Sequence, residues 1–512
     1  MNIFFRVDAS SDMGTGHVMR CLALAQVLRQ CGDRLVFICR MLPGNLLDVI
    51  EGHGHETVSL PAPDPSAELA PDELAHASWL GVHWTRDADE TAAAIADLTG
   101  TADWLIVDHY AIDARWEGLL RGRCQQILAI DDLADRPHDC DLLLDQNLHA
   151  DARARYTGRV APSCRLLCGP RYALLRSEFV AARSRIKPRD GAVSRIMVFF
   201  GGADQDNLTG VLIGELDEWL PSNIEIDVVV GVANPHKNLL RKMCAQRPQF
   251  VLHERVEDMA ALLNLTDLAI GAAGGSVWER CCLGVPSIVV SVAANQEAGL
   301  RQLGETGVAF AVEPHTRDPE ASVLAISNAL KFALISPLAL RHQSRLAAEL
   351  IDGQGAARIV RRMWKTKLHC RRADAADRDS ILAWRNHPAI RRVSRDSAEI
   401  DPRQHEAWLR AVIANPSVEL LICQSREQPV GVLRYDIHGE AAEVSIYLVP
   451  EWLGNGLGGE ALAAGEVWLR AERPAVRRIW ADVLAGNHGS MQMFRNAGFL
   501  DVSNRFERHL KS

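Results

Sequence analysis

A histidine follows a glycine-bearing turn near the start of the chain. Gly14 and Gly16 precede His17, between an apolar, strand-like run at 2–7 and a helix-like stretch at 18–30. Glycines let the backbone approach a ligand closely, and the first turn of a helix presents unpaired N–H groups to negative charge. An imidazole there can take a proton from water near neutral pH, because its ordinary pKa is about 6.5. The alternative is a structural turn in which His17 only caps the helix.

A second glycine-rich segment, at 271–280, reads GAAGGSVWER. The small residues Gly274, Gly275 and Ser276, directly before a helix, would let its N-terminal N–H groups meet a diphosphate. Glu279, one turn into that helix, could accept hydrogen bonds from both hydroxyls of a ribose. The alternative for Glu279 is an ordinary solvent-exposed helix residue. The pattern favours a site for a nucleoside diphosphate.

A third glycine-rich turn, at 454–459, lies between the strand-like run 444–449 and a helix. Consecutive backbone N–H groups in such a turn, together with the helix dipole, can hold a pyrophosphate. Farther along, the segment 487–499 (NHGSMQMFRNAGF) follows another strand-like run at 478–483. The two segments form a pair, and a pair is a more specific signal than a lone glycine turn.

The elements that must position these residues fall into three groups. Strand-like runs and helix-length stretches alternate through the first part of the chain and begin a second cycle at 195–200. That alternation predicts βαβ units and parallel sheets, so we expect two Rossmann-like domains of α/β class, 1–165 and 166–364. From residue 368 the pattern changes to helices followed by antiparallel-looking strands, which predicts a smaller α+β domain at 368–512.

Composition and charge exclude several classes of protein. The 512 residues are 48% hydrophobic and 24% charged, as in ordinary globular proteins, and the net charge is −9. A negative chain has no bulk attraction to nucleic acid or anionic lipid, and no apolar run is long enough for a membrane helix. Arg6 and Asp8 come too early for a secretory signal, so we expect a cytoplasmic protein without membrane insertion. Twelve scattered cysteines without a CxxC pair indicate reduced thiols.

The opening run 6–21 (RVDASSDMGTGHVMRC) resembles that of the UDP-2,4-diacetamido-2,4,6-trideoxy-β-L-altropyranose hydrolases of pseudaminic acid synthesis, which are relatives of MurG-like glycosyltransferases. The resemblance covers roughly 1–364 and implies a two-domain GT-B fold. Further motifs similar to that family follow in order: VDHY at 107–110, IDDL at 130–133, DLLLDQN at 141–147, GPRYALLRSEF at 169–179, GGAD at 201–204, the segment 271–280, GVP at 284–286 and NQ at 295–296.

The resemblance implies that water attacks the anomeric carbon of a UDP-amino sugar and releases UDP and the free 2,4-diacetamido sugar, with His17 as the base. Asp8 and Tyr110 are predicted to line the same cleft, although Asp8 could be a turn or cap residue and Tyr110 an aromatic at the core edge. No metal-ligand spacing is present, so we expect a reaction without a metal. The residues predicted to bind UDP and the sugar are Gly14, Gly16, Arg20, Arg171, Gly274, Gly275, Ser276, Glu279, Asn295 and Gln296.

The turn at 454–459 resembles motif A of the GNAT N-acetyltransferases, and the segment 487–499 is similar to their second cofactor motif. The resemblance implies acetyl-CoA as cosubstrate. Leu453 stands where many members carry Gln or Arg, and Phe494 stands where many place a tyrosine that protonates the CoA thiolate. A phenylalanine has no proton to give, so another residue or water acts, or thiolate release needs no acid. The residues predicted to bind acetyl-CoA are Leu448, Val449, Gly454, Gly456, Leu457, Gly458, Gly459, Asn487 and Phe494.

The start of this last domain, with WRN at 384–386 and HEAWL at 405–409, resembles the sugar-nucleotide N-acetyltransferase of the same pathway, and protein N-terminal acetyltransferases share part of the pattern. Its general base stays open among Glu443, His405 and Glu440. Acetylating the 4-amine of UDP-4-amino-4,6-dideoxy-β-L-AltNAc would yield the substrate of the hydrolase, so the fusion would join consecutive steps. The alternatives are a MurG-like glycosyltransferase, or a UDP-sugar-binding module joined to a protein N-terminal acetyltransferase.

Overall fold

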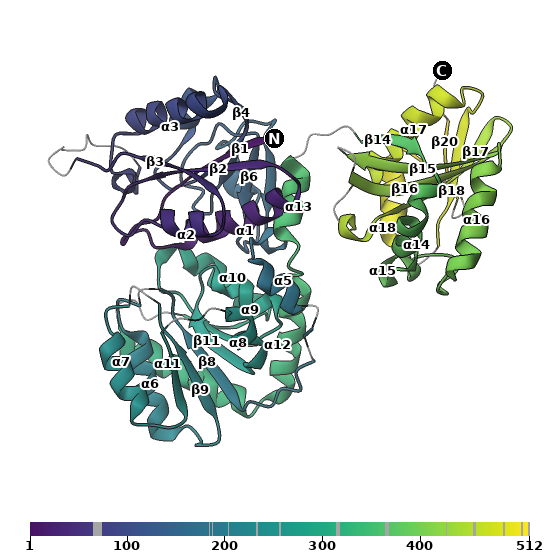
Figure 1. The fold of residues 1–512 in the computed structure, drawn as a ribbon. Helices are drawn as coiled ribbons and strands as arrows, with labels where there is room; N and C mark the ends of the chain where they lie inside the picture. Colours follow the sequence, from purple (N-terminus) through teal and green to yellow (C-terminus); the bar gives the residue numbers. More distant parts are fainter. Residues whose placement is uncertain are drawn as a thin grey trace. The chain divides into compact units, whose positions relative to one another are not determined.

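The computed structural model divides into two compact units, Met1–Met363 and Trp364–Ser512, and each is described by itself. Figure 1 shows three separate sheets along the chain, two in the first unit and one in the second. The structure describes the whole chain except residues 65–73, 184, 187, 203, 232–233, 255, 257, 314–317, 364–367, 426–427, 454–456, 485–486, 503–504 and 510–512.

The first sheet has seven parallel strands in the order β3-β2-β1-β4-β5-β6-β7, and with its helices it forms the first lobe. Its central strands are nearly continuous apolar runs, as expected when helices cover both faces of a sheet. The strands are β1 Asn2–Val7, β2 Arg34–Arg40, β3 Glu56–Leu60, β4 Ala102–Asp108, β5 Cys124–Ile130, β6 Leu142–Asp145 and β7 Arg165–Cys168. The helical elements are α1 Gly16–Gln30, α2 Leu47–Gly52, η1 Ala77–Leu80, α3 Trp84–Thr99, α4 Ala114–Leu120 and η2 Ala154–Tyr156.

The second sheet has six parallel strands in the order β10-β9-β8-β11-β12-β13 and forms the second lobe. The strands are β8 Arg195–Phe199, β9 Glu225–Val229, β10 Phe250–His253, β11 Leu268–Ala272, β12 Ser287–Val290 and β13 Phe310–Val312. The helical elements from the connection onward are η3 Pro170–Tyr172, α5 Ser177–Arg183, α6 Leu208–Trp219, α7 Lys237–Ala245, α8 Met259–Leu265, α9 Ser276–Cys282, η4 Ala294–Gln296, α10 Glu297–Glu305, α11 Pro319–Leu334, α12 Pro337–Leu350 and α13 Gly355–Met363.

Both parallel sheets reverse their strand order at the first strand of the lobe. β1 lies between β2 and β4, and β8 lies between β9 and β11. The loops after these strands therefore leave in opposite directions and open a crevice at the carboxyl ends, where α/β proteins bind their ligands. Functional side chains are therefore expected in the residues that follow β1, β4, β8 and β11.

The helix α13 returns from the second lobe and packs on α1 of the first. Arg165, in β7, donates from Nη2 to the carbonyl of Arg362 at 2.9 Å, which also holds α13 against the first lobe. Since β7 runs to Cys168, the first lobe extends slightly past the expected boundary at residue 165. The expected fold class, two Rossmann-like domains in a GT-B arrangement followed by a smaller α+β domain, is confirmed. No single described helix is long and apolar enough to cross a membrane. Taken together, one pair of consecutive described helices has sufficient length and apolar composition, but the pair is sharply bent.

The second unit is built on a seven-stranded mixed sheet in the order β14-β15-β16-β17-β18-β20-β19. Among the described strand pairs of this sheet, β17/β18 alone is parallel. The strands are β14 His369–Arg372, β15 Val418–Ser425, β16 Gln428–His438, β17 Ala441–Leu448, β18 Arg478–Asp482, β19 Leu500–Val502 and β20 Arg505–His509. The helical elements are η5 Ala375–Asp377, α14 Arg378–Asn386, α15 Pro388–Arg391, α16 Pro402–Ala414, η6 Pro450–Trp452, α17 Gly458–Glu472 and α18 His488–Asn496.

Candidate active sites

His17 lies at the start of α1, at the strand-order reversal of the first sheet. Its Nδ1 is 2.6 Å from Oδ1 of Asp108, the last residue of β4. The two side chains meet because β1 and β4 are neighbouring parallel strands whose carboxyl ends lie together. His17 is 7% exposed, and its Nε2 has no hydrogen-bond partner in the part of the chain that the structure describes.

Asp108 is held as a carboxylate by Arg20. The guanidinium donates from Nε to Oδ2 and from Nη2 to Oδ1, both at 2.6 Å. Burial alone would raise the pKa of Asp108, but Arg20 and His17 hold it well below its ordinary value. An ionised carboxylate only accepts hydrogen bonds, so we infer that Nδ1 of His17 donates to it. The lone pair is then on Nε2, which makes the imidazole a base with a fixed orientation.

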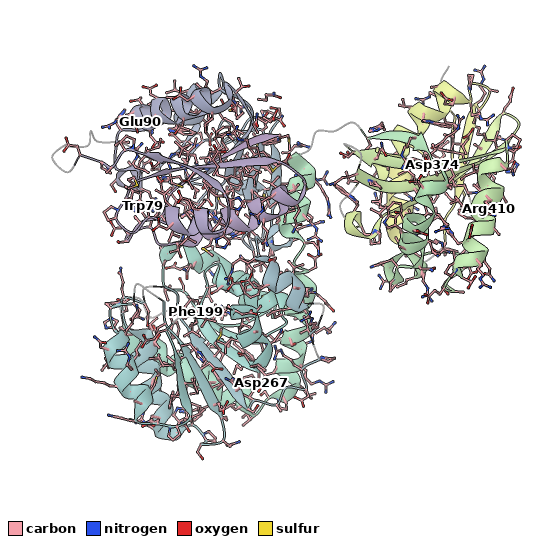
Figure 2. All side chains as sticks on the ribbon, viewed as in Figure 1. Trp79, Glu90, Phe199, Asp267, Asp374 and Arg410 are labelled. Carbon is pink, nitrogen blue, oxygen red and sulfur yellow. The ribbon has the colours of Figure 1, made fainter. Side chains whose placement is uncertain are left out.

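Aromatic side chains surround the His17 ring. The ring of Tyr110 meets it edge to face, with ring centroids 4.6 Å apart, and Trp79 stacks on Tyr110 at 5.7 Å. His76 contacts the rings of both Trp79 and Tyr110, at 4.7 and 5.4 Å. Trp79 is labelled on the first lobe in Figure 2. The Tyr110 hydroxyl donates to Oδ1 of Asp132 at 2.5 Å, so Tyr110 presents a ring to His17.

Asp8 is a correction to the sequence prediction. It is fully buried and accepts a hydrogen bond from the backbone N–H of Arg40 at 2.7 Å. It also forms an ion pair with Arg6 at 2.7 Å and lies 3.4 Å from Nε2 of His109. Its carboxylate therefore ties β1 to β2 inside the lobe and has no surface on which to line a cleft with His17. Arg40 and His109, which are distant in sequence and approach Asp8 only after folding, explain the difference.

The glycines before His17 form an open turn. Gly14 has a φ of +76°, which other residues rarely adopt, and its N–H donates to the carbonyl of Ser10 at 2.8 Å. A Cβ added at Gly14 or Gly16 would have no neighbour within 4 Å. Thr15, the N-cap of α1, makes no side-chain cap. The start of a 15-residue helix is thus uncapped and exposed beside His17.

In the second lobe, the loop after β11 brings two predicted segments together. A Cβ on Gly274 would lie 3.4 Å from Nε2 of Gln296, whereas one on Gly275 would meet nothing. Ser276 is the first residue of α9. Asn295 is exposed on the neighbouring turn. Five of the predicted nucleotide contacts therefore lie along one loop pair at the carboxyl ends of the strands.

Glu279 projects from the first turn of α9 with a side chain 21% exposed. Its Oε1 lies 3.4 Å from Nη2 of Arg176, which also pairs with Glu178 at 2.8 Å. Burial raises the pKa of Glu279, and Arg176 acts in the opposite direction. Arg171 is exposed on η3, with its guanidinium over the ring of Tyr172 at 5.4 Å.

In the second unit, β17 and β18 diverge. They pair only from Ala441 to Glu443, and the rest of β17 pairs with β16 alone. This leaves the β18 side of β17 open near Leu448, and a Cβ on Gly459, at the start of α17, would meet nothing within 4 Å. Leu457 and Val449 are buried, and a Cβ on Gly458 would clash with Met493. The predicted contacts Gly454 and Gly456 lie outside the described residues.

Two predicted acetyl-CoA contacts have other partners. The Asn487 side chain caps α18 by accepting from the N–H of Ser490 at 3.1 Å. Phe494 is 3% exposed, with ring centroids 5.1 Å from Phe499 and 5.7 Å from Phe506. The Phe494 ring therefore completes the core, and its contact with acetyl-CoA stays a prediction.

The three candidate bases differ in their surroundings. His405 is buried, and its Nε2 donates to the carbonyl of Arg378 at 3.0 Å, so it fixes α16 to α14. Glu440 is exposed at the β16–β17 turn. Glu443 lies where β17 and β18 part, and accepts from Arg395 at 3.1 Å. The geometry favours Glu443.

Comparisons with known proteins agree with this division. The N-terminal part is 30% identical over 312 residues to the UDP-2,4-diacetamido-2,4,6-trideoxy-beta-L-altropyranose hydrolase of Campylobacter jejuni, covering 60% of this chain and 97% of that enzyme. The chain belongs to this hydrolase family. The profile of the acetyltransferase (GNAT) domain matches residues 367–500, so a GNAT domain follows the hydrolase-family unit.

Two further proteins are similar to this chain. An uncharacterized protein of Methanocaldococcus jannaschii is 20% identical over 513 residues, covering 98% of this chain and 96% of that protein. The crystal structure of Acinetobacter baumannii MurG covers 71% of this chain and 99% of its own, with a TM-score of 0.48 and 14% identity.

The sequence alone missed several residues of the hydrolase-family site. Asp108 and Asp132 lie in the motifs VDHY and IDDL, but the sequence assigned neither residue a role. Asp108 could have been found, because ligands of α/β proteins bind at the carboxyl ends of strands and Asp108 ends β4. His76 and Trp79 lie on or beside the short element η1, and no periodic pattern marks them. Among the described residues, no group of three His, Cys, Asp or Glu side chains could hold a metal ion.

Proposed function

We propose that the hydrolase-family unit cleaves UDP-2,4-diacetamido-2,4,6-trideoxy-β-L-altropyranose into UDP and the free sugar, without a metal. The observation that carries this proposal is the His17–Asp108 pair, with Nε2 unoccupied beside an open helix start. Water attacks the anomeric carbon, the bond from that carbon to the phosphate oxygen breaks, and the water proton passes to Nε2. Asp108 then faces an imidazolium and stabilises it.

The second lobe holds the leaving group in this proposal. The loop Gly274–Ser276 meets the diphosphate, Glu279 accepts from the ribose hydroxyls, and Asn295 and Gln296 complete the rim. Arg171 and Arg20 stay in the proposed substrate set, Arg20 through its hold on Asp108. Diphosphate is a good leaving group, so the site mainly orients water and substrate and stabilises the charge that forms on the phosphate.

The GNAT domain is proposed to acetylate the 4-amino group of the precursor UDP-amino sugar with acetyl-CoA. The open edge of β17 and the start of α17 at Gly458 and Gly459 receive the cofactor. The amine nitrogen attacks the thioester carbonyl, the carbon–sulfur bond breaks, and Glu443 takes the amine proton. Water protonates the CoA thiolate, because Phe494 has no proton to give. The product of this step is the substrate of the hydrolysis. Acetyl-CoA and the UDP-amino sugar are both cytoplasmic metabolites.

The test uses the purified full chain with the UDP-4-amino sugar, with and without acetyl-CoA, and follows products by mass spectrometry. Acetylation followed by UDP release, without any added acceptor, supports the proposal and excludes a glycosyltransferase. His17→Ala should lower UDP release by about 100-fold or more while acetyl transfer continues at the rate of the unaltered protein. Unchanged UDP release in this variant would remove His17 from the mechanism.

A further inference from the structure

Arg280 is a buried cation without a carboxylate partner in the described part of the chain. It is 1% exposed. Its Nη2 donates to the carbonyl of Ala272 at 2.8 Å, its Nη1 lies 3.5 Å from Oγ of Ser276, and its Nε has no partner. The other arginines buried to this degree, Arg6, Arg40 and Arg136, each form an ion pair with an aspartate.

An unpaired charge of this kind is costly to bury, because it gives up its hydration and gains no counter-charge. Burial lowers the pKa of Arg280 to about 10, so the guanidinium still carries its charge at neutral pH. Glu279 attracts Arg280 electrostatically, but its carboxylate lies beside Arg176. The protein therefore keeps a positive charge under this loop that forms no ion pair with a described carboxylate.

The guanidinium lies directly under the loop that follows β11. A Cβ on Gly271 would stand 2.9 Å from Nη1 of Arg280 and 2.2 Å from the carbonyl oxygen of Phe199. Phe199, labelled in Figure 2, ends β8 at the strand-order reversal of the second sheet. The loop itself, GAAGGS, has no acidic side chain. Glu279 attracts Arg280 electrostatically without an ion pair, so a ligand phosphate seated on the loop would supply a closer counter-charge.

We propose that Arg280 is the counter-charge for the diphosphate of the bound nucleotide, acting as a positioning residue from beneath the Gly271–Ser276 loop. This inference rests on the proposed function. When the bond from the sugar to the phosphate oxygen breaks, the leaving diphosphate gains negative charge, and a fixed cation beneath the loop stabilises that charge. The arginine also discriminates a diphosphate from a neutral nucleoside.

The test compares binding of UDP and of uridine to the full chain by calorimetry, together with thermal unfolding. In Arg280→Met, a neutral side chain of similar size, affinity for UDP should fall by about 10- to 100-fold, and affinity for uridine should stay unchanged. Arg280→Lys should recover most of the UDP affinity. Arg189→Met is the matched control, because Arg189 also donates to carbonyl oxygens, those of Gly284 and Leu263, in the same lobe.

Stability separates this role from a structural one. Replacing an unpaired buried charge by an apolar side chain is neutral or stabilising, so Arg280→Met without ligand should unfold at or above the temperature of the unaltered protein. A variant that unfolds earlier, or one that binds UDP as well as the unaltered protein, overturns the proposal. If the unaltered protein itself does not bind UDP, the proposed hydrolase function fails first, and the two failures are distinguishable.

Discussion

The orientation of the His17 ring is set by a carboxylate that solvent does not reach. Asp108 is fully buried, and its two oxygens accept from both His17 and Arg20. Two effects follow from this arrangement. The imidazole is held in one tautomer, and in the proposed hydrolysis the positive charge that forms on it meets a fixed negative charge.

Asp108→Asn tests this role. An amide can offer its N–H₂ group to the ring and lose the charge, so UDP release should fall by about 100- to 10,000-fold. The matched control is Asp132→Asn, because Asp132 also accepts from Arg20 but does not contact His17. Steady-state UDP release is the measurement. Equal losses in both variants would show that the two residues act only by holding Arg20.

A second histidine links stability of the first unit to pH. Burial would lower the pKa of His138, but Glu117, at 2.8 Å from Nδ1, outweighs it and the pKa is raised. A raised pKa means that this stabilisation is complete below the ordinary value of about 6.5 and is lost as pH rises through the folded-state pKa. The free energy of unfolding of this unit should therefore fall as pH rises above about 6.5 and through the raised pKa of His138.

Glu117→Gln supplies the comparison, since the amide cannot hold the imidazolium. Differential scanning calorimetry at several pH values should show a shallower dependence for the variant in the transition of this unit. A slope identical to that of the unaltered protein would mean that His138 is not the group responsible.

Among the elements, β8 and β11 approach each other so closely that one residue cannot have a side chain. Gly271 pairs with Phe199, and a Cβ would meet the Phe199 carbonyl oxygen at 2.2 Å. Gly271→Ala should therefore cost about 1 to 3 kcal/mol of unfolding free energy. Gly275→Ala, where a Cβ meets nothing and φ is −54°, should change it by less than about 0.5 kcal/mol. Chemical denaturation of both variants measures the difference, and equal costs would contradict the close approach.

The elements that sequence predicts well are those with long apolar runs. The expected strand at 2–7 coincides with β1, and the one at 195–200 ends within one residue of β8. Such runs are buried on both faces, so their character does not depend on distant partners. The short edge strand β3 and the short helix α5 have weak local signals and were missed.

The residues of the candidate sites also divide into those that a local pattern predicts and those that depend on the tertiary fold. Gly14, Gly16 and His17 could be located because one local turn contains them all. The environment of Asp8 depends on Arg6 and Arg40 converging from two strands, which no local pattern encodes. Trp79 reaches His17 only through the tertiary fold, and the core position of Phe494 depends in the same way on β20.

For the whole molecule, the division into two compact units predicts separable activities. A chain of residues 1–363 should release UDP from the diacetamido sugar, and a chain of residues 364–512 should transfer acetyl groups, each within about threefold of the full protein. Parallel assays of the two fragments and of the intact chain measure this. A fragment that folds by circular dichroism but is inactive would show that its site needs the other unit.

The return of α13 to α1 has a consequence for the order in which the protein is synthesised. The helix α1, which contains His17 in its first turn, leaves the ribosome early, yet the helix that packs against it ends only at Met363, after the entire second lobe. Domains generally fold as units while the chain emerges. Here the first lobe stays incomplete until the second lobe has been translated, so the proposed hydrolytic centre is not complete in a nascent chain that ends before α13.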